Sequence, residues 1–264
     1  MTIYHLISKF FPEGKYKNKF RRVFYKLIYS LTWGYEEVAL DKEKTIFGKF
    51  YKPLFIKDSE PLNALLGYQR KYRLKRGDVV IDCGAFHGDF TIYAAKLVGE
   101  YGKVICFEPD AANFELLKRN IKLNNLKNVV LVQRGVWNEN TTLKFWSHGA
   151  DSALAESNNV DVYQQKIKNT LVEEVKVVRL DDFLKKINLK NVDFIKMDIE
   201  GAEIQALAGL KETISKNNVH FAIASYHVVN GEQTYKELER VFKKNKYSFK
   251  TEYPQHLTTY AKKN

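Results

Sequence analysis

Five short apolar segments after residue 77 constrain the fold of this chain more than any other feature. They are VVIDC (79–83), VICFE (104–108), VVLVQ (129–133), VDFIKMD (192–198) and FAIASYH (221–227). Helical periodicity occupies residues 89–99, 110–124 and 201–216 between them. Near-continuous apolar strands separated by helices are typical of a parallel sheet covered on both faces. The sequence therefore predicts a doubly wound, Rossmann-like α/β sheet that binds its ligands at the carboxyl ends of the strands.

Two regions depart from this alternation. A predicted helix at 232–245 is followed by the alternating segments KYSFKTEY and HLTTYAKK, which indicate a C-terminal antiparallel hairpin. Residues 139–180 are less regular and contain TLKFWS and VKVVRL, so we expect an inserted hairpin there.

The positive charge is concentrated in the first third of the chain. The 264 residues carry 43 Lys+Arg and 31 Asp+Glu, a net charge of +12. Residues 1–76 hold 17 basic and 7 acidic residues, so this segment alone has a net charge of +10. We expect a basic N-terminal extension over residues 1–72 and one main domain over residues 73–264.

The extension itself is predicted to contain an amphipathic basic helix at 19–33, short strands at 45–57 and a short helix at 61–73. Two interpretations of the basic helix stay open. It packs its apolar face on the main domain, or it lies on an anionic membrane or contacts a phosphate-bearing substrate.

Composition excludes several classes of protein. Hydrophobic residues make up 45% of the chain, which is too much for a disordered protein. Apolar stretches are interrupted before the length of a membrane span, and the first residues lack the pattern of a signal peptide, so we expect a cytoplasmic protein. Two cysteines, Cys83 and Cys106, do not suffice for a disulfide scaffold or a four-cysteine zinc site.

The segment VVIDCGAFHGDFT (79–91) is the strongest functional signal. A strand ends in Asp82, and Gly84 and Gly88 flank a turn before a helix. The dinucleotide pattern G-x-G-x-x-G is not met, because positions 86 and 89 hold Phe and Asp. A carboxylate here would repel a pyrophosphate but suits a cationic ligand such as S-adenosylmethionine. A purely structural strand–turn–helix is the alternative.

Acidic residues follow two further strands. Glu108 and Pro109 end the second strand, 26 residues after Asp82, where an acid in a nucleotide-binding fold accepts hydrogen bonds from ribose hydroxyls. Asp198 ends the fourth strand, at a place suited to a general base. Glu200 and Glu203 follow it, and acids in a first helical turn also have a purely structural explanation.

His227 ends the fifth predicted strand at the same edge of the sheet, so it is a second candidate for proton transfer. A divalent ion held by Asp198 and Glu200 is a less favoured variant, since oxygen ligands suit magnesium. We assign no metal site from the sequence.

These motifs together resemble the FkbM-type S-adenosylmethionine-dependent methyltransferases, which have the class I methyltransferase fold. The resemblance covers about residues 72–250 and includes FEPDAANFELLKRNIKLN, VRLDDF and IKMDIEGAE, of which the last is the most family-specific. It implies a methyl transfer from S-adenosylmethionine to a hydroxyl oxygen of a small molecule, sugar or glycolipid. Two positions depart from the family pattern, Phe86 in place of Asn and Ser225 in place of Glu.

The resemblance also implies roles for individual residues. Asp82, Gly84 and Gly88 line the methionine part of the cofactor, Glu108 holds the ribose, and Asp198 faces the reacting centre. Asp198, His227 and Glu200 are the expected catalytic residues. The residues expected to bind the cofactor are Asp82, Gly84, Ala85, Phe86, Gly88, Thr91, Glu108, Pro109 and Asp198.

The basic first third affects the expected partners. Its charge favours an acidic or phosphate-bearing acceptor, and it allows peripheral contact with an anionic membrane. The alternative is an RNA-binding or RNA-modifying protein that uses this basic third. Nucleic acid is disfavoured because no recognised RNA- or DNA-binding motif is present in the sequence. The sequence does not indicate an oligomeric state.

Overall fold

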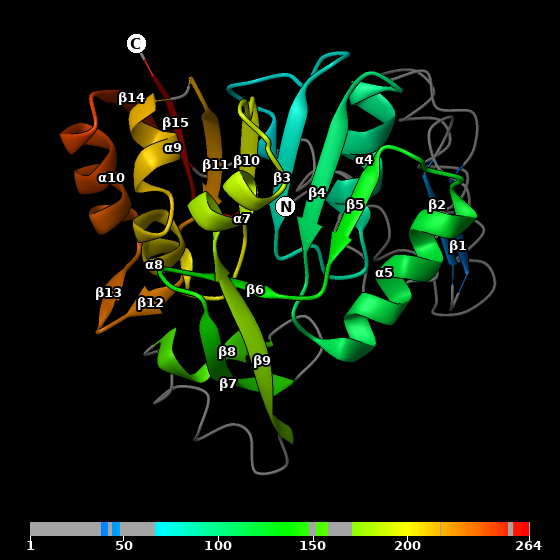
Figure 1. The fold of residues 1–264 in the computed structure, drawn as a ribbon, viewed down its shortest axis with the longest axis horizontal. Helices are drawn as coiled ribbons and strands as arrows, with labels where there is room; N and C mark the ends of the chain where they lie inside the picture. The colour runs from blue at the N-terminus through cyan, green and yellow to red at the C-terminus, as the bar shows by residue number, and fades with distance from the viewer. Residues whose placement is uncertain are drawn as a thin grey trace, which may run out of the picture.

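A computed structural model gives the fold (Figure 1). It describes residues 38–41, 44–47, 67–147, 152–157, 171–216, 218–252 and 256–263. The predicted helix at 19–33 lies outside the described residues, as do most of the predicted strands at 45–57 and residues 61–66 of the predicted helix at 61–73. In the described part of that last segment, only residues 67–68 are helical. Strands β1 (Val38–Asp41) and β2 (Lys44–Phe47) form a two-stranded antiparallel sheet. The division of the chain at residues 72 and 73 stays a prediction.

A seven-stranded sheet forms the centre of the described domain. Its strands, in spatial order, are β14 (Tyr247–Glu252), β15 (Thr258–Lys263), β11 (His220–Ala224), β10 (Phe194–Met197), β3 (Val79–Cys83), β4 (Lys103–Phe107) and β5 (Val129–Val132). The five strands from β11 to β5 are parallel, and β15 pairs antiparallel with both β11 and β14. This arrangement confirms the predicted doubly wound sheet and its C-terminal antiparallel hairpin.

Helices cover both faces of this sheet, as the apolar strands predict. They are α4 (Asp89–Val98), α5 (Ala111–Leu123), α7 (Leu180–Lys186), α8 (Glu203–Ala208), α9 (Lys211–Lys216) and α10 (Tyr235–Lys244). Successive residues of β3 serve opposite faces. Val80 packs in a cluster with α4 and α5, and Ile81 packs in a second cluster with α7, α8, α9 and α10. Burial on both faces explains why the strands lack a polar alternation.

A second, four-stranded sheet lies beyond the carboxyl ends of the parallel strands (Figure 1). Its strands, in spatial order, are β6 (Gly135–Trp137), β9 (Leu171–Arg179), β7 (Thr141–Ser147) and β8 (Ala153–Leu154), and a short 3-10 helix, η2 (Ala155–Ser157), follows β8. β7 and β9 pair antiparallel within the segment where the sequence predicts an inserted hairpin, but β8 and η2 lie between them in the chain, so they do not form a simple hairpin. The sheet is larger than that prediction, because β6 and β8 join it and it has its own apolar cluster around Trp137, Phe145 and Val177.

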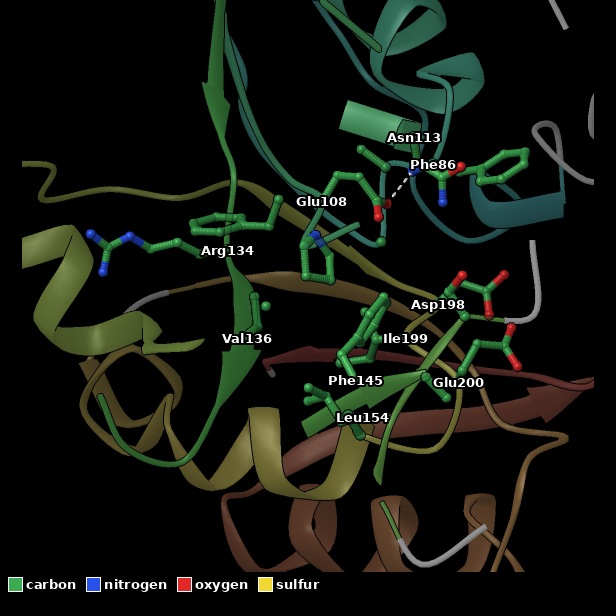
Figure 2. A pocket seen from close by; sticks show the side chains of 18 of the residues that line it. Phe86, Glu108, Asn113, Arg134, Val136, Phe145, Leu154, Asp198, Ile199 and Glu200 are labelled. Carbon is green, nitrogen blue, oxygen red and sulfur yellow. Dashed lines mark hydrogen bonds between the residues drawn. The ribbon is translucent and has the colours of Figure 1, made fainter. Parts of the chain in front are cut away.

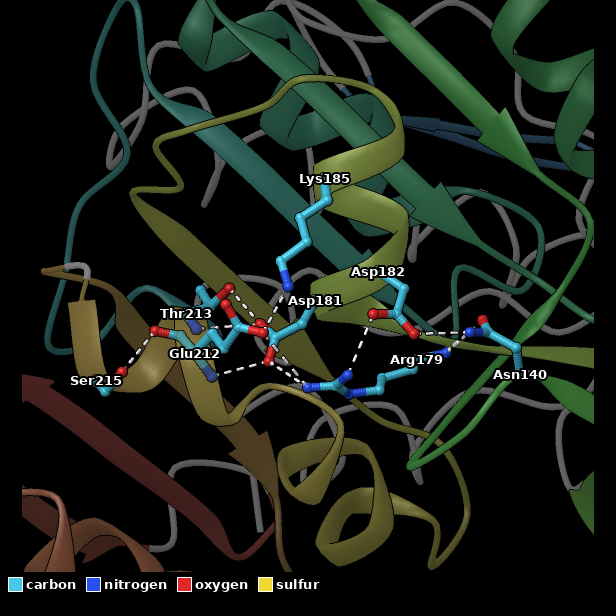
Figure 3. A network of polar contacts seen from close by, with 8 residues as sticks. All are labelled: Asn140, Arg179, Asp181, Asp182, Lys185, Glu212, Thr213 and Ser215. Atoms are coloured by element: carbon cyan, nitrogen blue, oxygen red, sulfur yellow. Dashed lines mark hydrogen bonds and ion pairs between the residues drawn. The ribbon is translucent and has the colours of Figure 1, made fainter.

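A polar network around the buried Asp181 joins the end of β9 to the helical layer (Figure 3). Asp181 accepts hydrogen bonds from the backbone nitrogens of Glu212 (2.8 Å) and Thr213 (3.0 Å), in the first turn of α9. Arg179 pairs with Asp182 at 3.1 Å and with Asp181 at 3.4 Å. Asp181 therefore supplies the helix-capping acceptor that α9 lacks in its own preceding residues, and this explains the acidic pair in VRLDDF.

Three boundaries differ from those that the sequence predicts. The helix expected at 201–216 is divided at Gly209, which packs so closely that a Cβ atom there would lie 2.3 Å from the carbonyl oxygen of Trp137. Strand β11 ends at Ala224, so His227 lies beyond the strand rather than within it. Helix α10 begins at Tyr235 because the residues before it pair as β12 (Val228–Val229) and β13 (Glu232–Gln233).

Within the described residues, no helix combines the length and apolar character needed to cross a membrane.

Candidate active site

One cavity lies between the ends of β3, β4 and β10 and the second sheet (Figure 2). Seven residues that the sequence singles out line it together: Gly84, Ala85, Phe86, Glu108, Pro109, Asp198 and Glu200. Four others do not line it: Asp82, Gly88, Thr91 and His227. The cavity therefore joins the glycine turn after β3 to the acidic ends of β4 and β10, which lie far apart in the sequence.

The turn after β3 forms one wall and requires unusual backbone geometry. Gly84 has φ +80°, and a Cβ atom there would lie 1.9 Å from the carbonyl oxygen of Asp198. Phe86 also has a positive φ of 50°, and its ring stacks on His87. Gly88, with φ +98°, precedes α4 and contacts Leu117 rather than the cavity. Only glycine fits at Gly84, because both the left-handed conformation and the close approach exclude a side chain.

Glu108 holds this turn from the neighbouring strand. Its two carboxylate oxygens accept hydrogen bonds from the backbone nitrogens of Phe86 (2.8 Å) and Asp110 (3.0 Å). The side chain is 5% exposed, and burial raises the pKa of Glu108 to about 7, although these two hydrogen bonds oppose the rise. A buried carboxylate with remaining lone pairs is suited to accept hydrogen bonds from ligand hydroxyls.

Asp82 lies behind the turn. It is completely buried, 3.2 Å from Nζ of Lys196 and bonded to the hydroxyl of Thr91 at 2.6 Å. Lys196 sits opposite Asp82 in the register of β10 with β3, and it also donates to the carbonyl oxygen of Gly84 at 2.8 Å. This placement corrects the expectation that Asp82 meets a cationic ligand directly. In the described structure the cation that faces Asp82 is Lys196, and the pair supports the turn from below.

Asp198 and Glu200 lie close together at one side of the cavity (Figure 2). One oxygen of Asp198 accepts a hydrogen bond from the hydroxyl of Tyr68 at 2.8 Å, and the hydroxyl of Tyr226 lies 3.5 Å from the other. Glu200 has a positive φ of 53° and precedes Gly201, so the chain turns sharply here before α8. Burial raises the pKa of Glu200, and His227 opposes that rise.

His227 lies just behind these two carboxylates and is 4% exposed. Its Nε2 lies 3.4 Å from Glu200 and 3.6 Å from Asp198, and its Nδ1 lies 3.0 Å from Glu203. Burial by itself would lower the pKa of His227, but attraction to the carboxylates of Glu203 and Glu200 outweighs burial and raises this pKa well above its usual 6.5. The surrounding carboxylates therefore favour the protonated form of His227, which compensates part of their negative charge.

Glu203 has a structural role as well. It is completely buried, and its Oε1 accepts hydrogen bonds from the backbone nitrogens of Ile199 (3.0 Å) and Gly201 (3.4 Å). Glu203 therefore fixes both His227 and the loop that carries Glu200.

Several residues of the site are not predicted by the sequence reasoning. Lys196 is the charged residue of the otherwise apolar β10, and that contrast is a signal that could have identified it. Tyr68 and Tyr226, which contact Asp198, carry no pattern of their own. The apolar wall formed by Val136, Phe145 and Leu154 depends on the second sheet, whose position no local pattern indicates.

Comparisons with known proteins agree with this architecture. The family described as the methyltransferase FkbM domain matches residues 82–249. Methyltransferase 1 of Beauveria bassiana is 32% identical over an alignment of 146 residues that covers 50% of this chain and 58% of that protein. The 2-O-methyltransferase NoeI of Sinorhizobium fredii is 28% identical over 152 residues, 54% of this chain and 61% of that protein. The matches thus span about three fifths of the length of these relatives.

A solved structure shows the same fold. The methyltransferase FkbM of Methylobacillus flagellatus superposes with a TM-score of 0.52 at 20% identity, over 77% of this chain and 48% of that one. The fold is thus the class I methyltransferase fold, as the sequence predicts. Because the family match extends from Asp82 through the β10 motif to β14, this chain belongs to the FkbM methyltransferase domain family.

Proposed function

We propose that this protein transfers a methyl group from S-adenosylmethionine to a hydroxyl oxygen of a small-molecule or saccharide acceptor. The observation that carries the proposal is the single cavity lined by the Gly84 turn, by Glu108 and by Asp198. The family and its methyltransferase relatives support methyl transfer, and the name of the relative NoeI supports oxygen as the accepting atom.

The methyl donor is assigned to the part of the cavity between β3 and β4. S-adenosylmethionine supplies an electrophilic methyl group on a sulfonium. The backbone of Gly84, Ala85 and Phe86 would contact its methionine part, and the absence of a Cβ at Gly84 lets this turn pack against the backbone of Asp198. Glu108 would accept hydrogen bonds from the ribose hydroxyls. Asp82, Thr91 and Gly88 would act indirectly, by holding the turn and the start of α4.

Asp198 is assigned as the residue that takes the acceptor's proton. A hydroxyl oxygen that gains a methyl group must lose its proton, so a base within hydrogen-bond reach lowers the barrier. His227 lies behind Asp198 and does not line the cavity, so it is less well placed to take this proton. It would instead orient Asp198 and Glu200 through its contacts with both carboxylates. Holding the acceptor oxygen in line with the methyl group supplies much of the remaining acceleration.

The acceptor is assigned to the side of the cavity next to Asp198 and Glu200. Apolar residues of the second sheet, such as Phe145 and Leu154, line the cavity as well, so the acceptor would bring an apolar surface beside its hydroxyl. The basic charge of residues 1–76 supports an acidic or phosphate-bearing acceptor, such as a nucleotide-linked or lipid-linked sugar. It is equally the basis for proposing peripheral contact with an anionic membrane.

Calorimetry with S-adenosylhomocysteine tests the donor site. Wild type should bind it, and Glu108→Ala should weaken binding by roughly 1.5–3 kcal/mol, the scale of charge-assisted hydrogen bonds. Glu139→Gln, which changes an exposed carboxylate away from the cavity, is the matched control. Equal affinity in wild type and Glu108→Ala would refute the assignment of the donor.

A metabolite screen tests the reaction. Isotope-labelled S-adenosylmethionine and wild-type protein should label a compound that contains a new O-methyl group, detected by mass spectrometry. Asp198→Asn should lower the labelling rate by roughly 100-fold or more while leaving S-adenosylhomocysteine affinity within a few-fold, since general-base catalysis contributes on that scale.

Deleting residues 1–35 should raise KM for an anionic acceptor, and unchanged kcat/KM would restrict the extension to a structural role.

A further inference from the structure

Three side chains with metal-binding atoms meet at the acceptor side of the cavity. Asp198 and Glu200 each offer a carboxylate oxygen and His227 offers a ring nitrogen, and these atoms lie within 4.8 Å of one another. Two cis ligands that each lie about 2.1 Å from one ion are separated by about 3.0–3.5 Å. The separations of 3.4 Å and 3.6 Å from His227 Nε2 to the two carboxylates are therefore close to those of a common coordination sphere.

His227 distinguishes this group from an ordinary cluster of surface acids. Its side chain is 4% exposed, and Nε2 is buried without a hydrogen bond of good geometry while it faces both carboxylates. The two carboxylates themselves are partly open to the cavity, with 12% and 16% of their side chains exposed. An ion could therefore enter from the cavity and reach a ligand that is fixed in the protein interior.

Glu203 completes the arrangement behind His227. Its Oε1 lies 3.0 Å from Nδ1 of the imidazole, on the side away from Asp198 and Glu200. A ligating histidine commonly donates its second ring N–H to a carboxylate, which fixes its orientation and raises its basicity. The same oxygen binds the backbone of Ile199 and Gly201, so one residue orients the imidazole and the loop that carries Glu200.

Charge balance also favours a cation at this place. Three carboxylates, from Asp198, Glu200 and Glu203, surround a single imidazole, so even a protonated His227 leaves an excess of negative charge. Lys196 ends on the same side of the sheet, but its ammonium pairs with Asp82 and donates to the carbonyl oxygen of Gly84.

We propose that Asp198, Glu200 and His227 bind one divalent cation at the acceptor side of the cavity. Two carboxylates and one imidazole suit a divalent first-row transition-metal ion such as Mn²⁺ better than they suit Ca²⁺, because Ca²⁺ is bound by oxygen ligands. Tyr68 occupies one oxygen of Asp198, so the ion takes the oxygen that faces His227. The coordination positions that the protein leaves open would accept water or the hydroxyl of the acceptor, which would place the acceptor oxygen beside Asp198.

Mn²⁺ binding to the chelator-treated full chain, followed by electron paramagnetic resonance, tests the proposal without any methyl donor or acceptor. Wild type should bind one ion per chain with a Kd on the order of 10–100 μM. Pulsed measurements on the bound ion should show coupling to an imidazole nitrogen. Because no methyl transfer is measured, failure here would leave the proposed methyltransferase function untouched.

Variants of the three ligands separate this site from adventitious binding. Glu200→Gln and His227→Gln should each weaken binding at least about tenfold, and His227→Gln should abolish the nitrogen coupling. Glu139→Gln, with its exposed carboxylate, should bind as wild type does. If His227→Gln does not fold, Glu200→Gln still decides the question, because its side chain reaches the cavity surface.

Three results would overturn the proposal. The first is that wild type binds no Mn²⁺ at about 1 mM, which is the weak end of the range for protein cation sites. The second is that the bound ion shows no coupling to a nitrogen. The third is that wild type and Glu200→Gln bind Mn²⁺ equally well.

Discussion

Gly84 and Asp198 are in direct backbone contact, although they end two different strands. The carbonyl oxygen of Asp198 lies where a Cβ atom of residue 84 would stand, 1.9 Å from its ideal position. The glycine turn after β3 and the acidic loop after β10 therefore share one packing constraint. A side chain at residue 84 would displace both walls of the cavity at once.

Gly84→Ala should lower the free energy of unfolding by roughly 3 kcal/mol or more, because strain from the positive φ adds to the clash with Asp198. Gly77→Ala is a matched control, since Gly77 has φ +90° and no atom within 4 Å of the added Cβ. It should cost only about 1–2 kcal/mol, the cost of the left-handed conformation. Urea unfolding measures the stability of both variants. Equal losses of unfolding free energy would show that the clash with Asp198 adds no cost.

Lys196→Met should destabilise the fold by about 3–5 kcal/mol, because it leaves the carboxylate of Asp82 buried without its cation. The double variant Asp82→Asn/Lys196→Met should recover much of that loss, since it removes the uncompensated charge. Lys118→Met, which removes an exposed partner of Glu115, should leave the unfolding midpoint nearly unchanged. A double variant no more stable than Lys196→Met alone would contradict this account of the pair.

S-adenosylhomocysteine should bind more tightly as pH rises through neutrality. Glu108 has a pKa of about 7 in the free protein, so part of the population is protonated at neutral pH. The ionised form accepts hydrogen bonds from two hydroxyls, so binding favours loss of the proton and affinity rises up to about tenfold per pH unit below that pKa. Calorimetry between about pH 6 and about pH 8 measures the slope.

Glu108→Gln is the matched variant for this measurement, since it keeps the shape of the side chain and removes its titration. It should bind more weakly than wild type and with a flatter pH dependence. An unchanged slope in Glu108→Gln would assign the pH dependence to another group.

The imidazolium of His227 should make stability depend on pH in the absence of metal. Its pKa in the folded protein lies well above 6.5, so its contribution is complete below that pH and is lost as pH rises through the folded-state pKa. The difference in free energy of unfolding between wild type and His227→Gln should therefore fall as pH rises above 6.5, measured by urea unfolding with a chelator present.

His220 provides the opposite case. Burial lowers the pKa of His220, so the corresponding difference for His220→Gln should not fall over the same range. A wild-type advantage over His227→Gln that grows with pH would show that His227 is neutral in the folded protein.

The sequence by itself determined the sheet and the positions of its acidic strand ends. Apolar runs that end in Asp82, Glu108 and Asp198 predict parallel strands, and parallel strands present their carboxyl ends at one edge. The glycine turn, Glu108 and Asp198 line one cavity, and this follows from that topology. The local pattern of apolar residues suffices to predict these strands because each strand is buried on both faces.

Only the tertiary structure decided which of these acids face the cavity and which face the interior. Asp82 and Glu108 look equivalent in sequence. Lys196 on the neighbouring strand β10 lies opposite Asp82, however, so its ammonium neutralises Asp82 behind the turn. His227 is likewise oriented by Glu203, which is distant in sequence and contacts the imidazole from α8. Such pairings depend on register between strands and on the packing of loops, and no local pattern of residues encodes either of them.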